Sequence, residues 1–574
     1  MDTKKLFKHI PWVILGIIGA FCLSVVALRR GEHVSALWIV VASVSVYLVA
    51  YRYYSLYIAQ KVMKLDPTRS TPAVINNDGL NYVPTNRYVL FGHHFAAIAG
   101  AGPLVGPVLA AQMGYLPGTL WLQAGVVLAG AVQDFMVLFI SSRRNGASLG
   151  EMIKQEMGPV PGSIALFGCF LIMIIILAVL ALIVVKALAE SPWGVFTVCS
   201  TVPIALFMGI YMRFLRPGRV GEVSVIGIVL LVASIWFGGI IAHDPYWGPA
   251  LTFKDTTITF TLIGYAFISA LLPVWLILAP RDYLATFLKI GVIVGLALGI
   301  VILNPDLKMP AVTQYIDGTG PLWKGALFPF LFITIACGAI SGFHATQSPL
   351  MTRCMESEKH GRMLFYGPMI AEGVLGLIWV TLGLSFYESP EALGAVIKAG
   401  TPTLVVQEIS MALLGPIGGM LAILGVVVLP ISTGDTAFRS ARLLVADTLR
   451  IDQGPIVKRL MIAVPLFTAG IALTFVDFAV IWRYFGWANQ TMSCVTLWAI
   501  AVYLARRERF HWIATLPAAF MTVVCVSYLC YAKIGFGMSV EMSTLIGIAS
   551  AAASLVLFLS RGKRMPELEN EASC

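Results

Sequence analysis

Residues 91–114 read FGHHFAAIAGAGPLVGPVLAAQMG, an apolar stretch long enough to cross a bilayer but interrupted at its centre. Gly100, Gly102, Pro103, Gly106 and Pro107 crowd into eight positions. Each proline removes a helical hydrogen bond, and each glycine weakens a helix by about 1 kcal/mol. Backbone groups freed within a membrane are tolerated only where they face protein or a water-filled cavity. The stretch therefore predicts a discontinuous helix, as in secondary transporters; the alternative is a kinked helix packed closely through its glycines.

Composition supports a membrane setting for the whole chain. The 574 residues are 58% hydrophobic and 12% charged, whereas a soluble domain is about 45–50% apolar and about 25% charged. This excludes a soluble enzyme, a disordered hub and a nucleic-acid module. The predicted fold class is an all-α polytopic membrane protein with about 16 transmembrane helices, namely an inverted-repeat transporter core with discontinuous helices plus extra helices. The spans are expected near residues 11–28, 34–57, 88–112, 119–142, 161–186, 194–212, 222–242, 257–279, 284–303, 325–350, 363–386, 404–433, 460–476, 485–505, 512–531 and 542–560.

The net charge of +10 reports topology and not a nucleic-acid partner. When the sides alternate at every expected span, about 30 of the 39 Lys and Arg residues fall on the side of the N-terminus, which is the positive-inside bias of cytoplasmic loops. We therefore expect an even number of spans with both termini in the cytoplasm. The nine cysteines show no metal-type spacing, so no metal and no cofactor are expected.

The chain is expected to form a single membrane domain over residues 1–574. Its core is expected to cover about 88–433, and residues 561–574 are expected to form a cytoplasmic tail. The loop at 61–87 is rich in turn residues and too short for a core of its own. A GxxxxGK[ST] phosphate loop is absent from the sequence, so an ion gradient, or the substrate's own gradient, is the expected source of energy.

Other expected spans are interrupted in the same way. Pro273 lies within residues 265–283, and two glycines lie within residues 333–349. The run LPISTGDTAFR at 429–439 places Asp435 at the cytoplasmic end of a span. Interrupted segments in both halves of a chain fit an inverted-repeat plan with a site between the halves.

Titratable residues inside expected spans are the next signal, because they are costly in lipid and normally face a partner or a pathway. His93 and His94 precede the glycine break, and His344 lies in a later interrupted span. A carboxylate kept from water, or a histidine, can take up a proton on one side and release it on the other. Structural hydrogen bonds to neighbouring helices are the alternative reading for each. The proton-coupling candidates are Asp134, Glu372 and Asp435.

The first break also suggests how a substrate is held. Pro103 suits the first turn of a second half-helix, whose exposed amides and positive dipole end suit a carboxylate. The candidate substrate-binding residues are Gly100, Gly102, Leu104, Gly106, His93, His94, His344 and Gln347. Sodium is the competing coupling ion and prefers oxygen ligands, although membrane hydroxyls commonly bond their own backbone. Its candidate ligands are Ile98, Ser341, Thr346 and Ser348.

The residues also resemble a known family. The stretch RYVLFGHHFAAIAGAGPLVGPVLAAQMGYLPGTLWLQAGVVLAGAVQDF at 87–135 resembles the signature region of the carbon starvation protein A family. The runs SRRNGASLGEMI (142–153), LPVWLILAPRDYLATFLKIG (272–291), GAISGFHATQSP (338–349) and ISTGDTAFRSARL (431–443) follow in the same order. The resemblance covers roughly residues 34–560. It implies similarity to the amino acid–polyamine–cation superfamily, with a ten-helix inverted-repeat core and additional helices.

The resemblance also implies a function. Such proteins take up peptides and, for some members, pyruvate with protons during nutrient limitation, and some have a small soluble accessory protein. The resulting hypothesis is an inner-membrane symporter, not an enzyme, that imports peptides or pyruvate, with protons as the expected coupling ion. Its expected partners are the carboxylate or peptide substrate, the proton or sodium ion, the bilayer and the accessory protein, with no nucleic acid. The alternatives are a sodium-coupled carrier and a channel or sensor.

Overall fold

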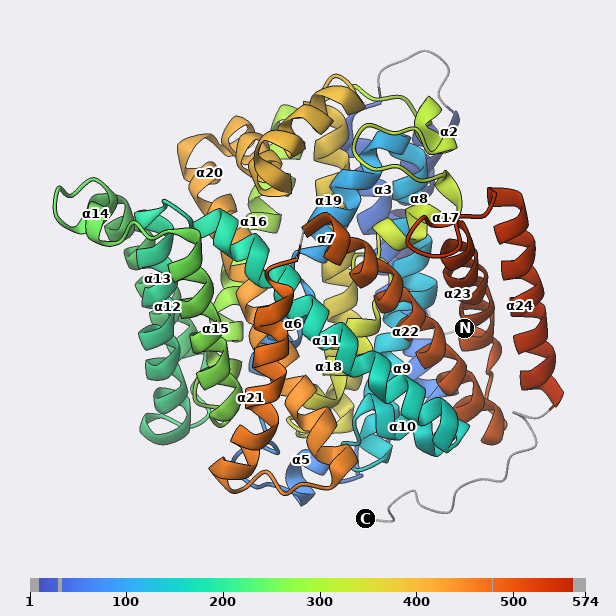
Figure 1. Ribbon diagram of the computed structural model, residues 1–574, viewed down its shortest axis with the longest axis horizontal. Helices are drawn as coiled ribbons and strands as arrows, with labels where there is room; N and C mark the ends of the chain where they lie inside the picture. Colours follow the sequence, from blue (N-terminus) through green and yellow to red (C-terminus); the bar gives the residue numbers. More distant parts are fainter. Residues whose placement is uncertain (1–9, 29–33, 477, 561–574) are drawn as a thin grey trace.

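The computed structural model describes residues 10–28, 34–476 and 478–560, and nearly all of these lie in helices (Figure 1). The first half contains α2 (Ile10–Leu28), α3 (Ala36–Val49), η1 (Ala50–Tyr54), α4 (Ser55–Tyr57), η2 (Ile58–Val62), α5 (Pro72–Ile75), α6 (Arg87–Ile98), α7 (Gly102–Ala110), η3 (Ala111–Met113), α8 (Tyr115–Gly125), η4 (Val126–Gly130), α9 (Ala131–Arg143), α10 (Leu149–Met157), α11 (Pro159–Leu188), α12 (Pro192–Ile210), η5 (Tyr211–Leu215), α13 (Val220–Ala242), α14 (Trp247–Ala250) and α15 (Asp255–Leu271). The second half contains α16 (Leu278–Leu303), η6 (Gln314–Asp317), α17 (Leu327–Thr334), α18 (Gly342–Thr352), η7 (Glu358–His360), η8 (Arg362–Tyr366), α19 (Gly367–Phe386), α20 (Pro390–Leu449), α21 (Ile456–Leu473), α22 (Phe478–Arg506), α23 (Trp512–Tyr531) and α24 (Val540–Ser560).

The number of spans differs from the expected number. Among the described residues, ten helices are long and apolar enough to cross a bilayer, and the bent pair formed by α6 and α7 raises this to eleven. Each expected span overlaps a helix or a broken pair, but the total of about 16 is not confirmed. The expected span at 404–433, for example, lies within α20, whose helical geometry is interrupted at Gly415 (φ +66°), where the shorter apolar helix Leu404–Gly415 ends. A hydropathy window locates apolar stretches, whereas the number of crossings depends on where helices bend and end. The inverted repeat stays a prediction.

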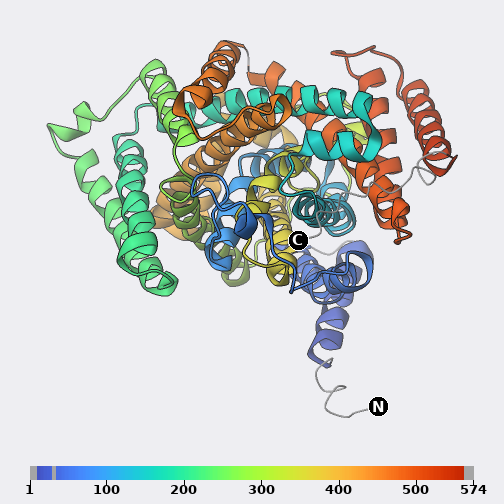
Figure 2. The ribbon, with the colours of Figure 1, turned by 90° about the horizontal axis from the view of Figure 1, so that it is seen from below.

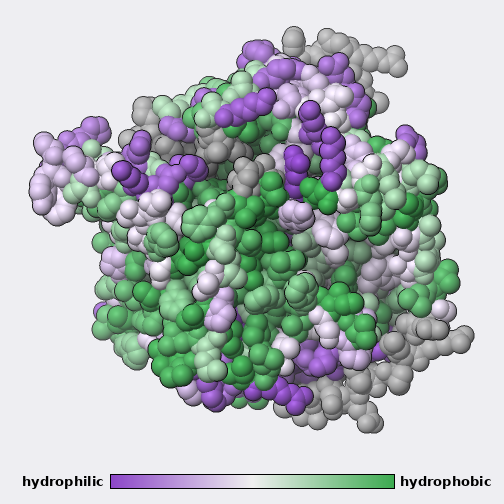
Figure 3. All heavy atoms as spheres, viewed as in Figure 1, coloured by the Kyte–Doolittle hydropathy of each residue, from purple (hydrophilic) through white to green (hydrophobic). Residues whose placement is uncertain are grey.

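Exposed apolar side chains cover the middle of the molecule. Figure 3 shows hydrophobic residues across the centre of one face, with hydrophilic residues gathered toward its top and bottom. Large side chains such as Val229, Val232 and Trp236 of α13 are more than half exposed. A soluble protein rarely exposes so much contiguous apolar surface. This band is the surface that a bilayer would cover, and the chain is a multi-pass membrane protein.

Arginine-rich loops meet at one end of the molecule. Glu156 accepts from Arg144 at 2.7 Å and from Arg506 at 3.3 Å, and Arg509 donates to the Met63 carbonyl at 2.8 Å. These contacts place the loops after α9, after α22 and after η2 together. We call this end, which carries Arg144, Arg506 and Arg509, the basic face.

The opposite end holds a second set of loops. Lys308 pairs with Glu388 at 2.6 Å, and the Ala326 amide donates to the Tyr531 hydroxyl at 3.1 Å. In the topology expected from the sequence, in which successive spans alternate in direction, these two sets of loops lie on opposite sides of the membrane. The residues at both termini, 1–9 and 561–574, lie outside the described residues, so their cytoplasmic location stays a prediction.

The broken helices lie at the centre of the bundle. α6 packs against α16, α7 against α19, and α18 against α9, while the tilted α11 crosses them and packs along α20 (Figure 1). Seen from below, α12 and α13 lie at one side and α23 and α24 at the other, with α2 and α3 projecting from the body (Figure 2). The surrounding helices therefore separate α6 and α18 from lipid.

Candidate functional site

The first break lies at residues 99–101. α6 ends at Ile98, and Ala99 has the non-helical angles φ −73° and ψ 64°. The Gly100 amide donates to the Ile98 carbonyl at 2.7 Å, and α7 then begins at Gly102 with Pro103 in its first turn. The two pieces meet at an angle of 44°. The discontinuous helix predicted from the sequence is confirmed. The break itself is shorter than expected, because Gly106 and Pro107 lie inside α7.

A second break separates α17 from α18. The non-helical residues 335–341 are held by side chains of neighbouring helices. Trp121 Nε1 donates to the Ile335 carbonyl at 3.1 Å, and Gln133 Nε2 donates to the Ser341 carbonyl at 2.6 Å. Asn489 of α22 accepts from the Phe343 amide at 2.8 Å. Backbone groups that a helix would pair internally are thus satisfied by protein, as a position within a bilayer requires.

The glycines of the first break serve close packing. A Cβ on Gly106 would lie 2.4 Å from the Thr334 carbonyl oxygen, and one on Gly102 would lie 2.7 Å from Cys337 Sγ. A Cβ on Gly100 would lie 2.7 Å from Thr433 Oγ1. Because these glycines lack side chains, α7 and the residues just before it can contact residues at the second break and in α20. For Gly106 the structure shows a packing role, and the substrate-binding role expected from the sequence stays a prediction.

The Gly106→Ala variant should therefore be destabilised by about 1–3 kcal/mol, because the added methyl group overlaps a backbone carbonyl that cannot rotate away. The measurement is the midpoint of thermal unfolding in detergent. Gly291→Ala in α16 is the matched control, since nothing lies within 4 Å of its Cβ position, and it should be neutral or slightly stabilising. Equal midpoints for the two variants would contradict the packing role.

The backbone amides of the break are partly occupied. The amides of Gly100 and Leu104 donate to the carbonyls of Ile98 and Ala101, at 2.7 and 3.2 Å. They are not the free donors that the sequence suggested, because the chain turns tightly here and pairs them locally. The described residues provide no hydrogen-bond acceptor for the Gly102 amide, which lies in the first turn of α7. It is the amide best placed for an anion.

His344 joins three helices. Its Nδ1 lies 3.2 Å from Asp134 Oδ2 of α9, and its Nε2 lies 3.2 Å from Glu372 Oε2 of α19. All three side chains are fully buried. The sequence singled out these residues separately, and the structure brings them together. A histidine between two carboxylates provides several adjacent proton-binding positions in an environment without water.

A second histidine–carboxylate pair lies on the other side of α6. His93 Nδ1 is 2.7 Å from Asp282 Oδ2 of α16, and Thr436 donates to the same carboxylate oxygen at 3.2 Å. Both members of the pair are fully buried. The contact links α6, α16 and α20 immediately before the first break. Asp282 was not among the sequence candidates, since it was taken to lie at the end of a span.

Lys289 of α16 lies at the end of α6. Its Nζ donates to the Ala96 carbonyl at 2.6 Å, to the Ala99 carbonyl at 3.0 Å and to Ser432 Oγ at 3.1 Å. The side chain is 2% exposed. The unpaired carbonyls at a helix C-terminus carry partial negative charge and favour a cation. The lysine ammonium is therefore a built-in cation at the break.

Two polar side chains in the same region lack partners. Both ring nitrogens of His94 and both amide atoms of Gln347 have no hydrogen-bond partner among the described residues. His94 lies within electrostatic range of His93 and His344. Both side chains are fully buried, and leaving such groups unsatisfied costs about 1–3 kcal/mol each. They are the side chains best suited to receive a polar ligand.

Asp435 is part of a separate ion pair. Arg281 Nη1 lies 2.9 Å from Asp435 Oδ2, and Tyr265 donates to the same oxygen at 2.9 Å. The guanidinium also lies over the Tyr265 ring at 4.4 Å. The structure thus gives Asp435 an arginine partner, and its proton-coupling role stays a prediction. The contact joins α15, α16 and α20.

Breaking this buried pair should be strongly destabilising. Asp435→Asn leaves the Arg281 charge buried without a carboxylate, which costs about 3–5 kcal/mol, and the thermal midpoint in detergent should fall accordingly. The Arg281→Met/Asp435→Leu double variant removes both charges and should recover most of that loss. A double variant no more stable than the single one would show that the pair is not the source of the effect.

The expected sodium ligands make hydrogen bonds within the protein. The Thr346 and Ser348 hydroxyls donate to carbonyls of their own helix at 2.7 and 2.6 Å, and Ser341 bonds to Asn489. The Ile98 carbonyl accepts from the Gly100 amide. The sodium site at these residues stays a prediction. Short hydroxyl side chains find an acceptor one turn back on their own helix, which is closer than any neighbouring span.

Several residues of the site were missed from the sequence. Lys289 lies within an expected span, so a search for charged residues inside apolar stretches would have found it. Asp282 lies in the run PRDY, whose proline suggested a span end. Asn489 of α22 lies outside the expected core of residues 88–433 and contacts Ser341 and Phe343.

Comparison with known proteins gives the family. A profile described as carbon starvation protein CstA matches residues 35–395 and 391–528. The chain belongs to the carbon starvation protein CstA family. Two relatives from Escherichia coli (strain K12) are named pyruvate/proton symporter BtsT and peptide transporter CstA. The family and these relatives are transporters, not enzymes, as the sequence predicted.

The CstA-family relatives differ in how much of their length is matched. BtsT is 89% identical over 379 residues, which are 66% of this chain and 53% of that protein. The E. coli CstA is 47% identical over 592 aligned positions, which cover 91% of this chain and 84% of that protein. The match to BtsT thus spans about half the length of that relative. Among solved structures, the crystal structure of MhsT in complex with L-phenylalanine aligns with a TM-score of 0.47 at 12% identity, covering 82% of this chain and 98% of that chain.

Proposed function

We propose that this CstA-family chain is a secondary transporter that imports a small carboxylate, either pyruvate or a short peptide, together with protons during nutrient starvation. The observation that carries the proposal is the buried cluster formed by His344, Asp134 and Glu372 next to two broken helices. The names of BtsT and CstA, a pyruvate/proton symporter and a peptide transporter, support the same substrates.

The carboxylate is bound at the junction of the two breaks. The Gly102 amide and the positive end of α7 favour its negative charge. His94 and Gln347 are buried without partners, so each gains a hydrogen bond when the substrate enters. Both candidate substrates carry a carboxylate, and this feature of the site therefore does not distinguish pyruvate from a peptide.

The coupling proton is carried by the cluster around His344. Two carboxylates and one imidazole, all buried, cannot hold three isolated charges without a large desolvation cost. Protonation of Glu372 or Asp134 lowers the net negative charge next to His344, and release of that proton restores it. Binding of the substrate anion nearby favours the protonated form. The two events are therefore thermodynamically linked, which is the requirement for symport.

Lys289 makes a coupling sodium ion unnecessary at the first break. Its ammonium already contacts the carbonyls that a cation at this break would use. A second cation would be repelled by the first at such short range. Proton coupling is therefore favoured over the sodium alternative.

We further propose the setting of the transporter. The basic face lies in the cytoplasm and the protein resides in the inner membrane, in accordance with the positive-inside rule. The transporting core extends from α6 to α22, within one membrane domain. A small soluble accessory protein is expected only from the family resemblance.

The test is uptake into proteoliposomes that contain the full chain. Labelled pyruvate, dipeptides and tripeptides are offered under a proton gradient alone and under a sodium gradient alone. We expect accumulation of pyruvate or peptide with acid outside, and none driven by sodium. Accumulation driven by sodium alone would contradict proton coupling. Counterflow of labelled against unlabelled substrate separates a carrier from a channel, since only a carrier exchanges.

A further inference from the structure

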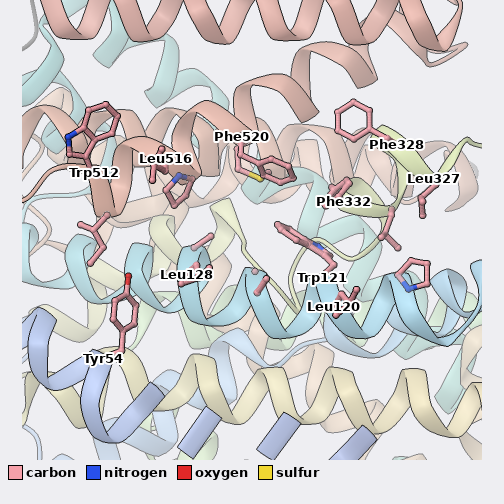
Figure 4. A pocket seen from close by; sticks show the side chains of 18 of the residues that line it. Tyr54, Leu120, Trp121, Leu128, Leu327, Phe328, Phe332, Trp512, Leu516 and Phe520 are labelled. Atoms are coloured by element: carbon pink, nitrogen blue, oxygen red, sulfur yellow. The ribbon is translucent and has the colours of Figure 1, made fainter. Parts of the chain in front are cut away.

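An apolar groove runs along the side of the bundle, away from the central site. Its cavity volume is about 780 Å³, within the range of ligand-binding pockets. Figure 4 shows its two long walls, one carrying Leu120, Trp121 and Leu128 and the other Trp512, Leu516 and Phe520. Phe328 and Phe332 close one end, and Tyr54 lies at the other. The walls belong to α8 with η4, and to α23, while α17 closes the end.

The Tyr54 end of the groove is the end next to the basic face. Trp512 begins α23, directly after the arginine-rich loop at 506–509. Arg509 donates to the Met63 carbonyl, so this loop lies beside the end of η2, which follows Tyr57. Tyrosine and tryptophan are enriched at the level of lipid headgroups. The groove therefore begins at the membrane interface and extends inward from there.

The length of the groove corresponds to one leaflet. From Ala129 back to Pro117, the wall formed by η4 and α8 extends for about 18 Å at 1.5 Å per residue. One leaflet contributes about half of the roughly 30 Å hydrocarbon thickness. The lining is almost entirely hydrocarbon and aromatic, and such a space is unfavourable for water. An extended alkyl chain entering from the interface fits both the length and the chemistry.

The positive charge near the Tyr54 end of the groove favours an anionic lipid headgroup. The segments 58–65 and 505–512 contain Lys61, Lys64 and three arginines but only one carboxylate, Glu508. Lys61 and Lys64 are exposed, and Arg506 is already paired with Glu156. Basic residues next to the membrane surface attract anionic lipids, at about 1 kcal/mol per lysine or arginine. We propose that the groove holds an acyl chain of an anionic phospholipid, with its headgroup beside Lys61 and Lys64.

This site is connected to the second break. Trp121 lines the groove and also donates its indole hydrogen bond to the Ile335 carbonyl between α17 and α18. Its ring packs edge-on against Phe332 at a centroid distance of 4.8 Å. A lipid chain in the groove packs against both rings and holds Trp121 in place. The lipid thus supports the non-helical segment that belongs to the central site.

The test is lipid retention, which does not depend on transport or on the proposed substrate. The full chain is reconstituted in nanodiscs with equal amounts of phosphatidylglycerol and phosphatidylethanolamine, then released and analysed by native mass spectrometry. We expect one retained phospholipid, with phosphatidylglycerol favoured about tenfold. Ala124→Trp places a large ring in the groove and should remove it. Ala552→Trp, on an exposed position of α24, is the matched control and should retain it.

The Lys61→Gln/Lys64→Gln double variant changes only exposed side chains and keeps the test valid if Ala124→Trp does not fold. It should retain a phospholipid but lose the preference for phosphatidylglycerol. Three results would overturn the proposal: no retained lipid in the unchanged chain, equal retention by Ala124→Trp and Ala552→Trp, or equal retention of the two lipids. A dimer that Ala124→Trp abolishes would assign the groove to a second copy of the chain instead.

Discussion

The Lys289→Met variant is expected to lose gradient-driven uptake by at least about 100-fold. The methionine replaces the apolar part of the lysine side chain, to about the position of Cε, but removes the ammonium that donates to the carbonyls of Ala96 and Ala99. The Ala99 carbonyl then loses its lysine donor and the Ala96 carbonyl keeps only the Ser432 hydroxyl at 3.4 Å, and a buried group left unsatisfied costs about 1–3 kcal/mol. A loss of about 3 kcal/mol in the working conformation corresponds to about 100-fold. Initial uptake rates in proteoliposomes, normalised to the amount of monodisperse protein, give the measurement.

Lys308→Met provides the matched control. Lys308 is partly exposed and pairs with Glu388 on the face opposite the basic face, where an ion pair contributes little. The uptake rate of the Lys308→Met variant should stay within about twofold of that of the unchanged chain. Normal uptake by Lys289→Met would show that the cation at the first break is dispensable, and the argument against sodium would then lose its basis.

The Glu372→Gln variant is expected to separate substrate binding from proton coupling. Glutamine has the same shape and can still bond to His344, but it cannot take up a proton. Accumulation under a proton gradient should be abolished, whereas counterflow without a gradient should continue. Uptake by the unchanged chain should rise as the external pH falls, because the proton is a co-substrate, and this dependence should be flat in the variant. Asp134→Asn, at the other side of His344, is expected to behave in the same way.

Glu408→Gln is the control for this change. Glu408 lies in α20 and accepts from the Tyr387 hydroxyl at 2.8 Å, away from His344. Its accumulation and pH dependence should match those of the unchanged chain. If Glu372→Gln and Asp134→Asn both accumulate substrate normally, neither carboxylate carries the proton, and the cluster around His344 is purely structural.

Properties that depend on residues close together in the sequence could be predicted from the sequence. The membrane setting follows from composition, and the first break follows from the local effect of Gly100, Gly102 and Pro103 on the helix. The titratable residues inside apolar stretches, such as His344, were recognised because burial makes them costly wherever they lie. Local reasoning did not predict the close contact of Gly106 with the Thr334 carbonyl, because this contact depends on what packs against the helix.

Pairings between distant segments were decided only by the tertiary structure. Lys289 reaches a carbonyl 193 positions away, and His93 reaches a carboxylate 189 positions away. No local pattern encodes such a contact, since it depends on how whole helices pack. The pairing of Asp435 with Arg281 has the same origin.

From the residues alone, the protein was determined to be a membrane-embedded bundle with at least one interrupted helix and buried titratable groups. Packing decided which of these groups face each other, that a lysine lies at the first break, and which glycines allow close contact between helices. The reason is physical: solvent preference and backbone propensity belong to short segments, whereas the electrostatic environment of a buried group is made by helices distant in sequence.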